Sequence, residues 1–256
     1  MRFVGIALLV SVCAVAQERI NVPFSDPNRP KTVKVNLIEG TMTVRTHAGR
    51  DVIVESGGGG QREEVRNGLR RLTMHPGLNI EEENNVVEIK GTGVSRSNIT
   101  ILVPSQTTLN LKGVNSCRID VQGVDGDIDA NCVNGSIELT NVSGSVVAHS
   151  VNGAVRASLD RVNPQKPMAF STLNGDVEVT LPAATKADLR MKTTNGDVYT
   201  DFEVTIGPTP SGSIERSREG GKYRVRIDRG IQGTINGGGQ LITLNSLNGR
   251  IYLRKK

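Results

Sequence analysis

The stretch VNGSIEL, Val133–Leu139, is one copy of a unit that recurs through the middle of the chain. The units begin at Val124, Val133, Val142 and Val151, so each one starts nine residues after the last. Within each unit, apolar and polar residues alternate around a glycine, and alternation with period two is typical of a strand with one buried face. A repeat this regular decides the fold class.

Nine residues are half of the predicted structural period. Asn134 and Asn152 lie in Val-Asn-Gly units eighteen residues apart, and Asp125 and Ser143 take the equivalent place in the units between them. This predicts two strands and two corners per coil, with glycine supplying the positive φ that a tight corner needs. Asn-Gly flanked by alternation is also a hairpin signal, so an antiparallel β-meander or sandwich is the alternative.

The unit recurs toward the C-terminus at three further Asn-Gly pairs, of which the first two lie 21 residues apart. We therefore expect an all-β fold, a right-handed single-domain β-solenoid (β-helix) with two short strands per coil of roughly 18–21 residues. The predicted corner residues are Gly126, Asn134, Gly135, Gly144, Asn152, Gly153, Asn174, Gly175, Asn195, Gly196, Asn248 and Gly249.

The composition agrees with a thin aliphatic core. The chain has no Trp, three Tyr and four Phe but 29 Gly, whereas an ordinary globular core uses aromatic bulk. The formal net charge of +5 is mild for 256 residues, and the basic residues are dispersed. Nucleic acid is therefore not an expected partner.

The first sixteen residues have the features of a signal peptide. Arg2 precedes an apolar run, Phe3–Val15, and Ala16 ends an A-x-A sequence that predicts cleavage before Gln17. The run is shorter than the roughly 20 apolar residues of a membrane span, and no other run is comparable. We expect an exported mature domain, 17–256, in the periplasm, at the cell surface or outside the cell, without a transmembrane segment. Lipid anchoring through Cys13 is the alternative.

One segment, 57–85, interrupts the repeat. Four glycines, 57–60, are followed by a run of charged residues that includes several arginines. This composition predicts an exposed loop.

Asp125, Asp127 and Asp129 are the candidate metal ligands. Alternation places the three carboxylates on one side of a strand, where they could bind Ca²⁺ or act as the acids of a polysaccharide-cleaving enzyme. The equivalent positions of neighbouring units do not continue the acidic row. We therefore predict no catalytic residue and no cofactor, and keep calcium as a weak candidate.

Cys117 and Cys132 remain after the predicted cleavage. On an eighteen-residue coil Cys117 stacks on Gly135, three residues from Cys132, which is about 10 Å along a strand and beyond the reach of a disulfide. An irregular coil would close that distance. A disulfide and two buried thiols both remain open.

The serial units VNGSIEL (Val133–Leu139) and LNGDVEV (Leu173–Val179), with Gly233–Gly239 and Leu247–Ile251, resemble the Toastrack family of bacterial adhesin-like proteins of unknown function. The resemblance covers most of the predicted mature chain. It implies a β-solenoid in an exported or surface protein and brings no catalytic residues with it.

We expect a non-enzymatic binding or structural protein of the bacterial cell envelope, whose partner is an unidentified envelope or surface protein or polysaccharide. Two alternatives from other classes are a polysaccharide-active β-helix enzyme and a periplasmic sensory module of an envelope-stress system.

Overall fold

The all-β prediction is confirmed. The computed structural model describes residues 18–56, 65–66, 69–70, 77–92, 97–207, 215–219, 222–226 and 230–256. These residues form strands and turns, and none of them forms a helix long and apolar enough to cross a membrane. The predicted signal peptide, with Cys13, Ala16 and Gln17, lies outside the described residues.

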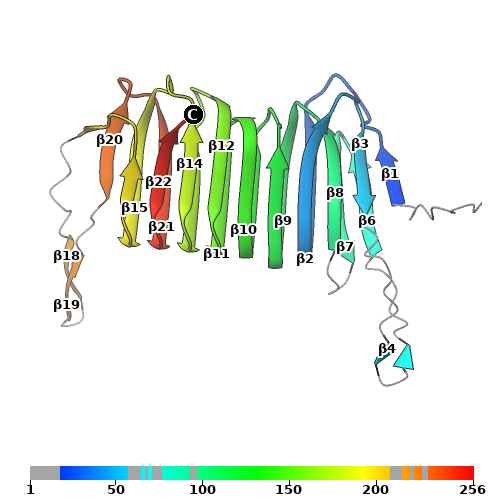
Figure 1. Cartoon of the computed structure of the whole chain (residues 1–256), viewed down its shortest axis with the longest axis horizontal. Helices are drawn as coiled ribbons and strands as arrows, with labels where there is room; N and C mark the ends of the chain where they lie inside the picture. Colours follow the sequence, from blue (N-terminus) through cyan, green and yellow to red (C-terminus); the bar gives the residue numbers. More distant parts are fainter. Residues whose placement is uncertain are drawn as a thin grey trace, which may run out of the picture.

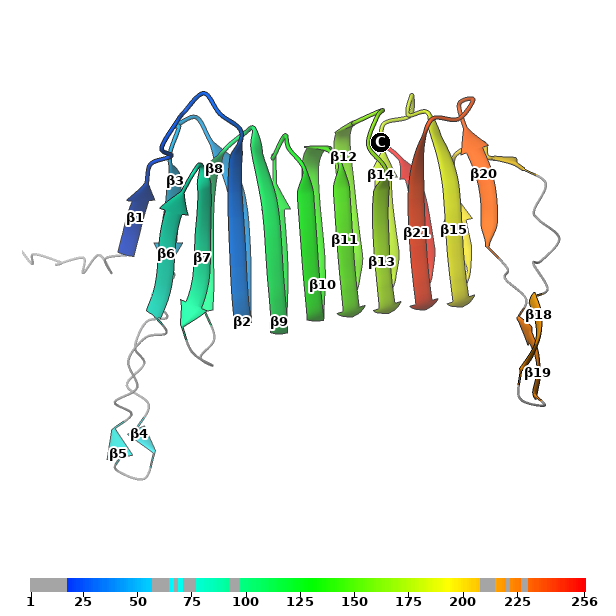
Figure 2. The same ribbon diagram turned by 180° about the vertical axis from the view of Figure 1, so that it is seen from behind.

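Most strands belong to one large, mainly parallel sheet that forms two facing layers (Figures 1 and 2). Its strands are β1 (Glu18–Val22), β2 (Lys31–His47), β3 (Val52–Ser56), β6 (Gly77–Glu83), β7 (Val86–Thr92), β8 (Ser97–Pro104), β9 (Thr107–Gln122), β10 (Ile128–Gly144), β11 (Val146–Asn152), β12 (Val155–Val162), β13 (Met168–Asn174), β14 (Val177–Leu181), β15 (Ala187–Asn195), β16 (Val198–Thr200), β17 (Thr205–Ile206), β20 (Ile231–Ile235), β21 (Gln240–Asn248) and β22 (Ile251–Lys255). Two separate pairs are β4 (Val65–Arg66) with β5 (Leu69–Arg70), and β18 (Glu215–Glu219) with β19 (Lys222–Arg226).

The centre of the sheet is parallel. The first half of β10 pairs with β11 and its second half with β12, so that Ile128 lies beside Val146 and Ile137 beside Val155. Both pairs of partners are eighteen residues apart in sequence. The antiparallel meander does not form here, and antiparallel pairs occur toward the two ends, as in β1–β3, β3–β8, β6–β7 and β15–β20.

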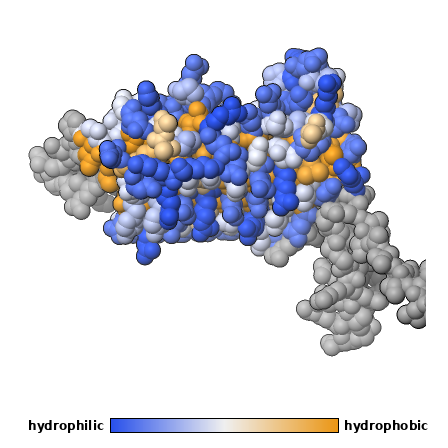
Figure 3. All heavy atoms as spheres, turned by 45° about the horizontal axis from the view of Figure 1, so that its top comes forward, coloured by the Kyte–Doolittle hydropathy of each residue, from blue (hydrophilic) through white to orange (hydrophobic). Residues whose placement is uncertain are grey.

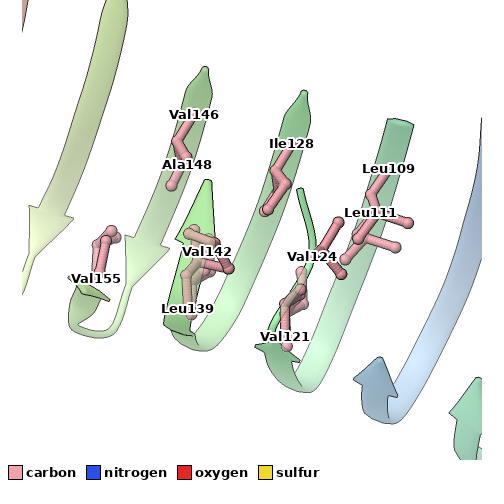
Figure 4. Packing of buried hydrophobic residues seen from close by; sticks show 14 of the residues in the cluster. Leu109, Leu111, Val121, Val124, Ile128, Leu139, Val142, Val146, Ala148 and Val155 are labelled. Atoms are coloured by element: carbon pink, nitrogen blue, oxygen red, sulfur yellow. The ribbon is translucent and has the colours of Figure 1, made fainter. Parts of the chain in front are cut away.

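The core lies between the two layers. Alternate residues of every central strand point inward and are almost fully buried, and Figure 4 shows Leu139, Val142 and Ile128 among them. The buried cluster is dominated by Val, Ile, Leu and Ala, as the composition indicated. Outward-facing residues make the visible surface mainly hydrophilic, with smaller hydrophobic patches between them (Figure 3).

The strand order departs from the sequence order at the C-terminal end. Asn248 of β21 pairs with Asn174 of β13 on one side and with Asn195 of β15 on the other. Correspondingly, β22 lies between β14 and β16. The prediction that the 21-residue spacing between Asn174 and Asn195 is the length of one coil is therefore wrong. The C-terminal strands occupy the position between these two asparagines.

The N-terminal end has a related arrangement. Val33 of β2 pairs with Val87 of β7 on one side and Leu109 of β9 on the other, so the chain must pass β2 to reach β9 from β8. The connection from β14 to β15 passes the C-terminal strands in the same way. Each of these connections begins at a proline, Pro104 or Pro182.

The predicted loop at 57–85 is corrected for its last nine residues. Gly77–Glu83 is strand β6, paired antiparallel with β7, and a turn at Asn84 and Asn85 with positive φ joins the two strands. Leu78 and Ile80 alternate with polar residues and pack against the core, which is why a charged segment forms a strand here. The Gly57–Gly60 run lies outside the described residues.

The Asn-Gly corners stack through their side-chain amides. Five of the six asparagines in this row donate one Nδ2–H bond to the Oδ1 of the Asn beside them, and the row ends at Asn115, which precedes Ser116. The six amides are here called the Asn ladder. Its bonds run from Asn195 to Asn248 (2.6 Å), Asn248 to Asn174 (2.7 Å), Asn174 to Asn152 (2.7 Å), Asn152 to Asn134 (2.7 Å) and Asn134 to Asn115 (3.2 Å).

The glycines after these asparagines bring backbones into direct contact. A Cβ on Gly153 would lie 2.1 Å from the carbonyl oxygen of Gly135, and one on Gly175 would lie 2.4 Å from that of Gly153. Gly153 and Gly175 also have φ values of +156° and +154°. At the opposite edge Gly144 stacks on Gly126 in the same way, at 2.6 Å. Successive nine-residue units thus supply corners to alternate edges.

A hydroxyl completes each corner. Two residues before the Asn, Ser150, Thr172, Ser246 or Thr193 donates a hydrogen bond of 2.8–2.9 Å to the corner glycine carbonyl of the neighbouring coil. This satisfies a buried acceptor that the tight corner would otherwise leave unpaired.

Replacing a corner glycine tests the close approach. We expect Gly153→Ala to lower the free energy of unfolding by about 3 kcal/mol or more, because it adds a backbone clash to the cost of positive φ. The matched control is Gly237→Ala, where φ is +89° but a Cβ would meet nothing within 4 Å. That variant should lose only about 1–2 kcal/mol. Equal losses in urea unfolding would contradict the stacking argument.

The N-terminal end of the sheet contains a pH-dependent contact. The hydroxyl and amide of Ser25 donate to the Glu82 carboxylate at 2.8–3.1 Å, and these hydrogen bonds hold the pKa of Glu82 below its ordinary value of 4.5. A carboxyl whose pKa is lower in the folded state stabilises it above the unfolded pKa. This stabilisation disappears as the pH falls through the folded pKa.

We therefore expect Glu82→Gln to lower the melting temperature at pH 7 and to match the unsubstituted protein at a pH below the folded pKa of Glu82. Glu83→Gln, on the same strand, is the control and should behave like the parent at both pH values. A Glu82→Gln deficit that persists unchanged in acid would show that the carboxylate charge plays no part.

Candidate functional site

The three candidate calcium ligands have different partners in the structure. Asp125 pairs with Arg161 at 2.6 Å and Asp127 with Lys166 at 2.6 Å. Asp129 accepts hydrogen bonds from the side-chain amides of two neighbouring asparagines, at 2.7 and 3.2 Å. Within the described parts of the chain no three His, Cys, Asp or Glu side chains gather as metal ligands would. Each of the three carboxylates thus has a polar partner of its own within the chain.

Cys117 and Cys132 are buried free thiols. Cys117 lies beside Gly135, the register expected from an eighteen-residue coil, and Cys132 Sγ donates to the carbonyl oxygen of Cys117 at 3.3 Å. Hydrogen bonding to Cys117 and burial raise the pKa of the Cys132 thiol, so it stays neutral at physiological pH. Cys132 thus occupies the corner position that Ser150 and Thr172 take in later coils.

One outward-facing row gathers the side chains with the most binding chemistry. The row consists of the residues four positions after the Asn of each Asn-Gly pair in the Asn ladder, and parallel pairing sets them side by side. Its members, in spatial order, are Glu138, Arg156, Glu178, Tyr252 and Tyr199.

Tyr252 and Tyr199 form a stacked aromatic pair at the end of this row. Their ring centroids are 5.3 Å apart and their planes differ by 14°. Tyr252 is half-buried, whereas 48% of Tyr199 is exposed because β16 pairs only with β22 among the described strands. The pair therefore presents an aromatic surface at the margin of the sheet.

Charged groups surround this pair. Arg250 Nη1 donates to the Tyr252 hydroxyl and the Tyr199 hydroxyl donates to Asp197, both at 3.4 Å. Arg254 lies over the Tyr252 ring, with Cζ 5.5 Å from the centroid, and its Nε is 3.0 Å from Glu178. Hydrogen bonding to Tyr252 raises the pKa of Arg250, so its guanidinium remains cationic. We call Asp197, Tyr199, Arg250, Tyr252 and Arg254 the tyrosine patch.

The tyrosine patch combines an exposed ring with donors and acceptors of both charges. An exposed aromatic face packs against flat apolar surfaces, and the phenol hydroxyls keep a polar edge toward water. Carboxylate and guanidinium groups can bond ligand hydroxyls through charge-assisted hydrogen bonds. This arrangement can contact a ligand through both its aromatic face and its polar edge.

The tyrosine patch was not predicted from the sequence, although a signal was present. Tyr199 and Tyr252 each follow an Asn-Gly pair at the same distance, four residues after Asn195 and Asn248. Aligning the units on their asparagines would have placed both rings in one row. The insertion of β22 beside β14, which leaves Tyr199 at the margin, had no counterpart in the repeat pattern.

Comparison with known proteins agrees with the repeat analysis. Residues 131–236 match the family model described as Toastrack DUF4097, so the predicted resemblance is confirmed over this range. No curated protein matches the chain. Two solved structures are similar to it. One, a putative cell adhesion protein from Clostridium sporogenes, has a TM-score of 0.44 and 13% identity, over 94% of this chain and 99% of that one. The other, a putative adhesin from Bacteroides fragilis, has a TM-score of 0.28 and 10% identity, over 95% and 98%.

The corner role of Cys132 leads to a prediction. Cys132→Ser should stay within about 1 kcal/mol of the parent in urea unfolding, because serine donates the same hydrogen bond that Ser150 does. Cys132→Val should lose about 1–3 kcal/mol, since the buried Cys117 carbonyl would lose its donor. A destabilised serine variant beside an unaffected valine variant would contradict this role.

Proposed function

We propose that this protein is an exported, non-enzymatic binding protein of the bacterial cell envelope, and that the tyrosine patch contacts a polysaccharide. The observation that carries the proposal is the stacked pair Tyr199 and Tyr252, which is exposed at one end of a polar face.

The chemistry of the patch favours a sugar. The carbon-bound hydrogens of a pyranose form a flat apolar face that can pack on an aromatic ring. Its hydroxyls would meet Asp197 and Arg250, whose acceptor and donor groups lie at the hydroxyl edges of the two rings. A polymer suits this site, because weak contacts repeated along an extended partner add up through multivalency.

The rest of the fold is consistent with this role. In this proposal the domain is 17–256, wound as a right-handed β-solenoid whose outer faces contribute further contacts. The signal peptide of residues 1–16, cut between Ala16 and Gln17, would deliver it to the envelope, with lipid anchoring at Cys13 as the alternative route. The names of the two similar structures point to adhesion for those proteins, and the proposal extends that role to this chain.

No contact among the described residues specifically favours the alternative of a polysaccharide-active enzyme. A glycosidase needs two carboxyl groups across a bound sugar, and Asp125 and Asp127 are each paired with a different cation. We therefore keep the binding function alone.

Glycan binding by purified residues 17–256 tests the proposal. The probes are an array of pyranose oligosaccharides and purified bacterial cell-wall polysaccharide. We expect Tyr199→Ala combined with Tyr252→Ala to weaken binding by about tenfold or more, since the stacking surface is removed. Tyr199→Phe with Tyr252→Phe keeps both rings and should retain most of the affinity.

Glu138→Ala is the matched surface control, because it lies in the same row away from the tyrosine patch. Thermal melting of each variant establishes that it is folded. The proposal fails if the parent binds no glycan, or if the double alanine variant is folded and binds as the parent does.

A further inference from the structure

The Asn ladder protects its inner asparagines on two sides. At Asn152, Asn174 and Asn248 the side-chain amide is held by its neighbours, and the following glycine N–H donates to the Asn carbonyl of the next coil. The glycine bonds are Gly153 to Asn174 (2.9 Å), Gly175 to Asn248 (3.0 Å) and Gly249 to Asn195 (3.1 Å).

Asn195 is the last rung and lacks half of these contacts. Its Nδ2 donates to Asn248, but no described residue donates to its Oδ1. The Gly196 N–H makes no hydrogen bond within the described chain, because no described strand pairs with β16 on the side away from β22. Gly196 is exposed to solvent, whereas Gly153, Gly175 and Gly249 are half-buried.

These differences matter because Asn-Gly has a characteristic reaction. The backbone nitrogen of the glycine attacks Cγ of the asparagine side chain, gives up its proton, and expels the side-chain nitrogen as ammonia. The product is a five-membered succinimide. Water then opens the ring at either carbonyl and leaves an aspartate or an isoaspartate. A glycine favours the reaction because it has no side chain to hinder the approach.

We propose that Asn195 is a site of spontaneous deamidation, and that stacking protects Asn152, Asn174 and Asn248. In those inner rungs the attacking nitrogen must first lose its hydrogen bond to the next coil. At Asn195 only the hydrogen bond from its side-chain amide to Asn248 has to break. These four Asn-Gly positions therefore differ in chemical lifetime although their local sequences are alike.

The modification would change the end of the stack. A carboxylate at position 195 cannot donate to Asn248 Oδ1, so the terminal bond of the Asn ladder is lost. The new charge lies two residues from Asp197, within the segment that carries Tyr199. An isoaspartate also lengthens the backbone by one atom at a corner where Gly196 lies against the Gly249 carbonyl. This inference does not depend on the proposed function.

The experiment is an incubation of purified residues 17–256 at mildly alkaline pH, with deamidation at each Asn-Gly peptide followed by mass spectrometry. In the folded protein we expect Asn195 to react at least about tenfold faster than Asn152, Asn174 or Asn248, the scale of one hydrogen bond retained or lost. In denaturing urea the four rates should converge, because every one of these asparagines precedes a glycine.

The variant Asn195→Gln is the chemical control, because its longer side chain does not form the five-membered ring. Its peptide should show no mass increase on the timescale of the Asn195 reaction. Inner rungs that react as fast as Asn195 in the folded protein would overturn the proposal, and so would a rate ratio that stays the same in urea.

Discussion

The contact between glycine backbones at the corners is the constraint on which the rest of the structure depends. Gly135, Gly153 and Gly175 approach so closely that no Cβ fits between successive coils. With the backbones at that distance, the preceding asparagine must act as donor and acceptor at once, and an amide can do both. The hydroxyl two residues earlier then pairs the glycine carbonyl. The hydroxyl residue, the asparagine and the glycine thus set the distance between coils and satisfy the hydrogen bonds at these corners.

This constraint also organises the surface. Because each corner fixes the register of the strands on both sides, residues at equal distances from the asparagines fall into straight rows. Glu178, Tyr252 and Tyr199 are neighbours for that reason alone, although they come from three different repeats. Ion pairs along the same face, such as those of Glu178 with Arg156 and Arg254, largely neutralise it. The row ends at Tyr199, because β16 has no second neighbour among the described strands.

Much of the fold could be predicted from the repeat. The period-two alternation, the glycine corners and the neighbourhood of Cys117 and Gly135 all follow from local sequence, which reports burial and turn geometry. The position of Asn248 between Asn174 and Asn195 could not be predicted, because the three corners have the same local chemistry and pairing between them depends on long-range packing. The tyrosine patch was missed for a different reason. The composition shows few aromatic residues, but it does not show that two of them stack on each other in the folded chain.

The insertion of β21 and β22 makes this part of the sheet depend on contacts between segments far apart in the sequence. Residues 240–255 fill the position between two coils that come earlier in the chain. Until they arrive, β13 and β15 have no common neighbour, and the buried rows on either side stay open to water. Lys256 adds a contact over a longer range, since it contacts Asn141 and Asp160 on strands more than ninety positions upstream. Forming this part of the sheet therefore requires the closure of long loops before the apolar rows are buried, which is an entropic cost that slows folding.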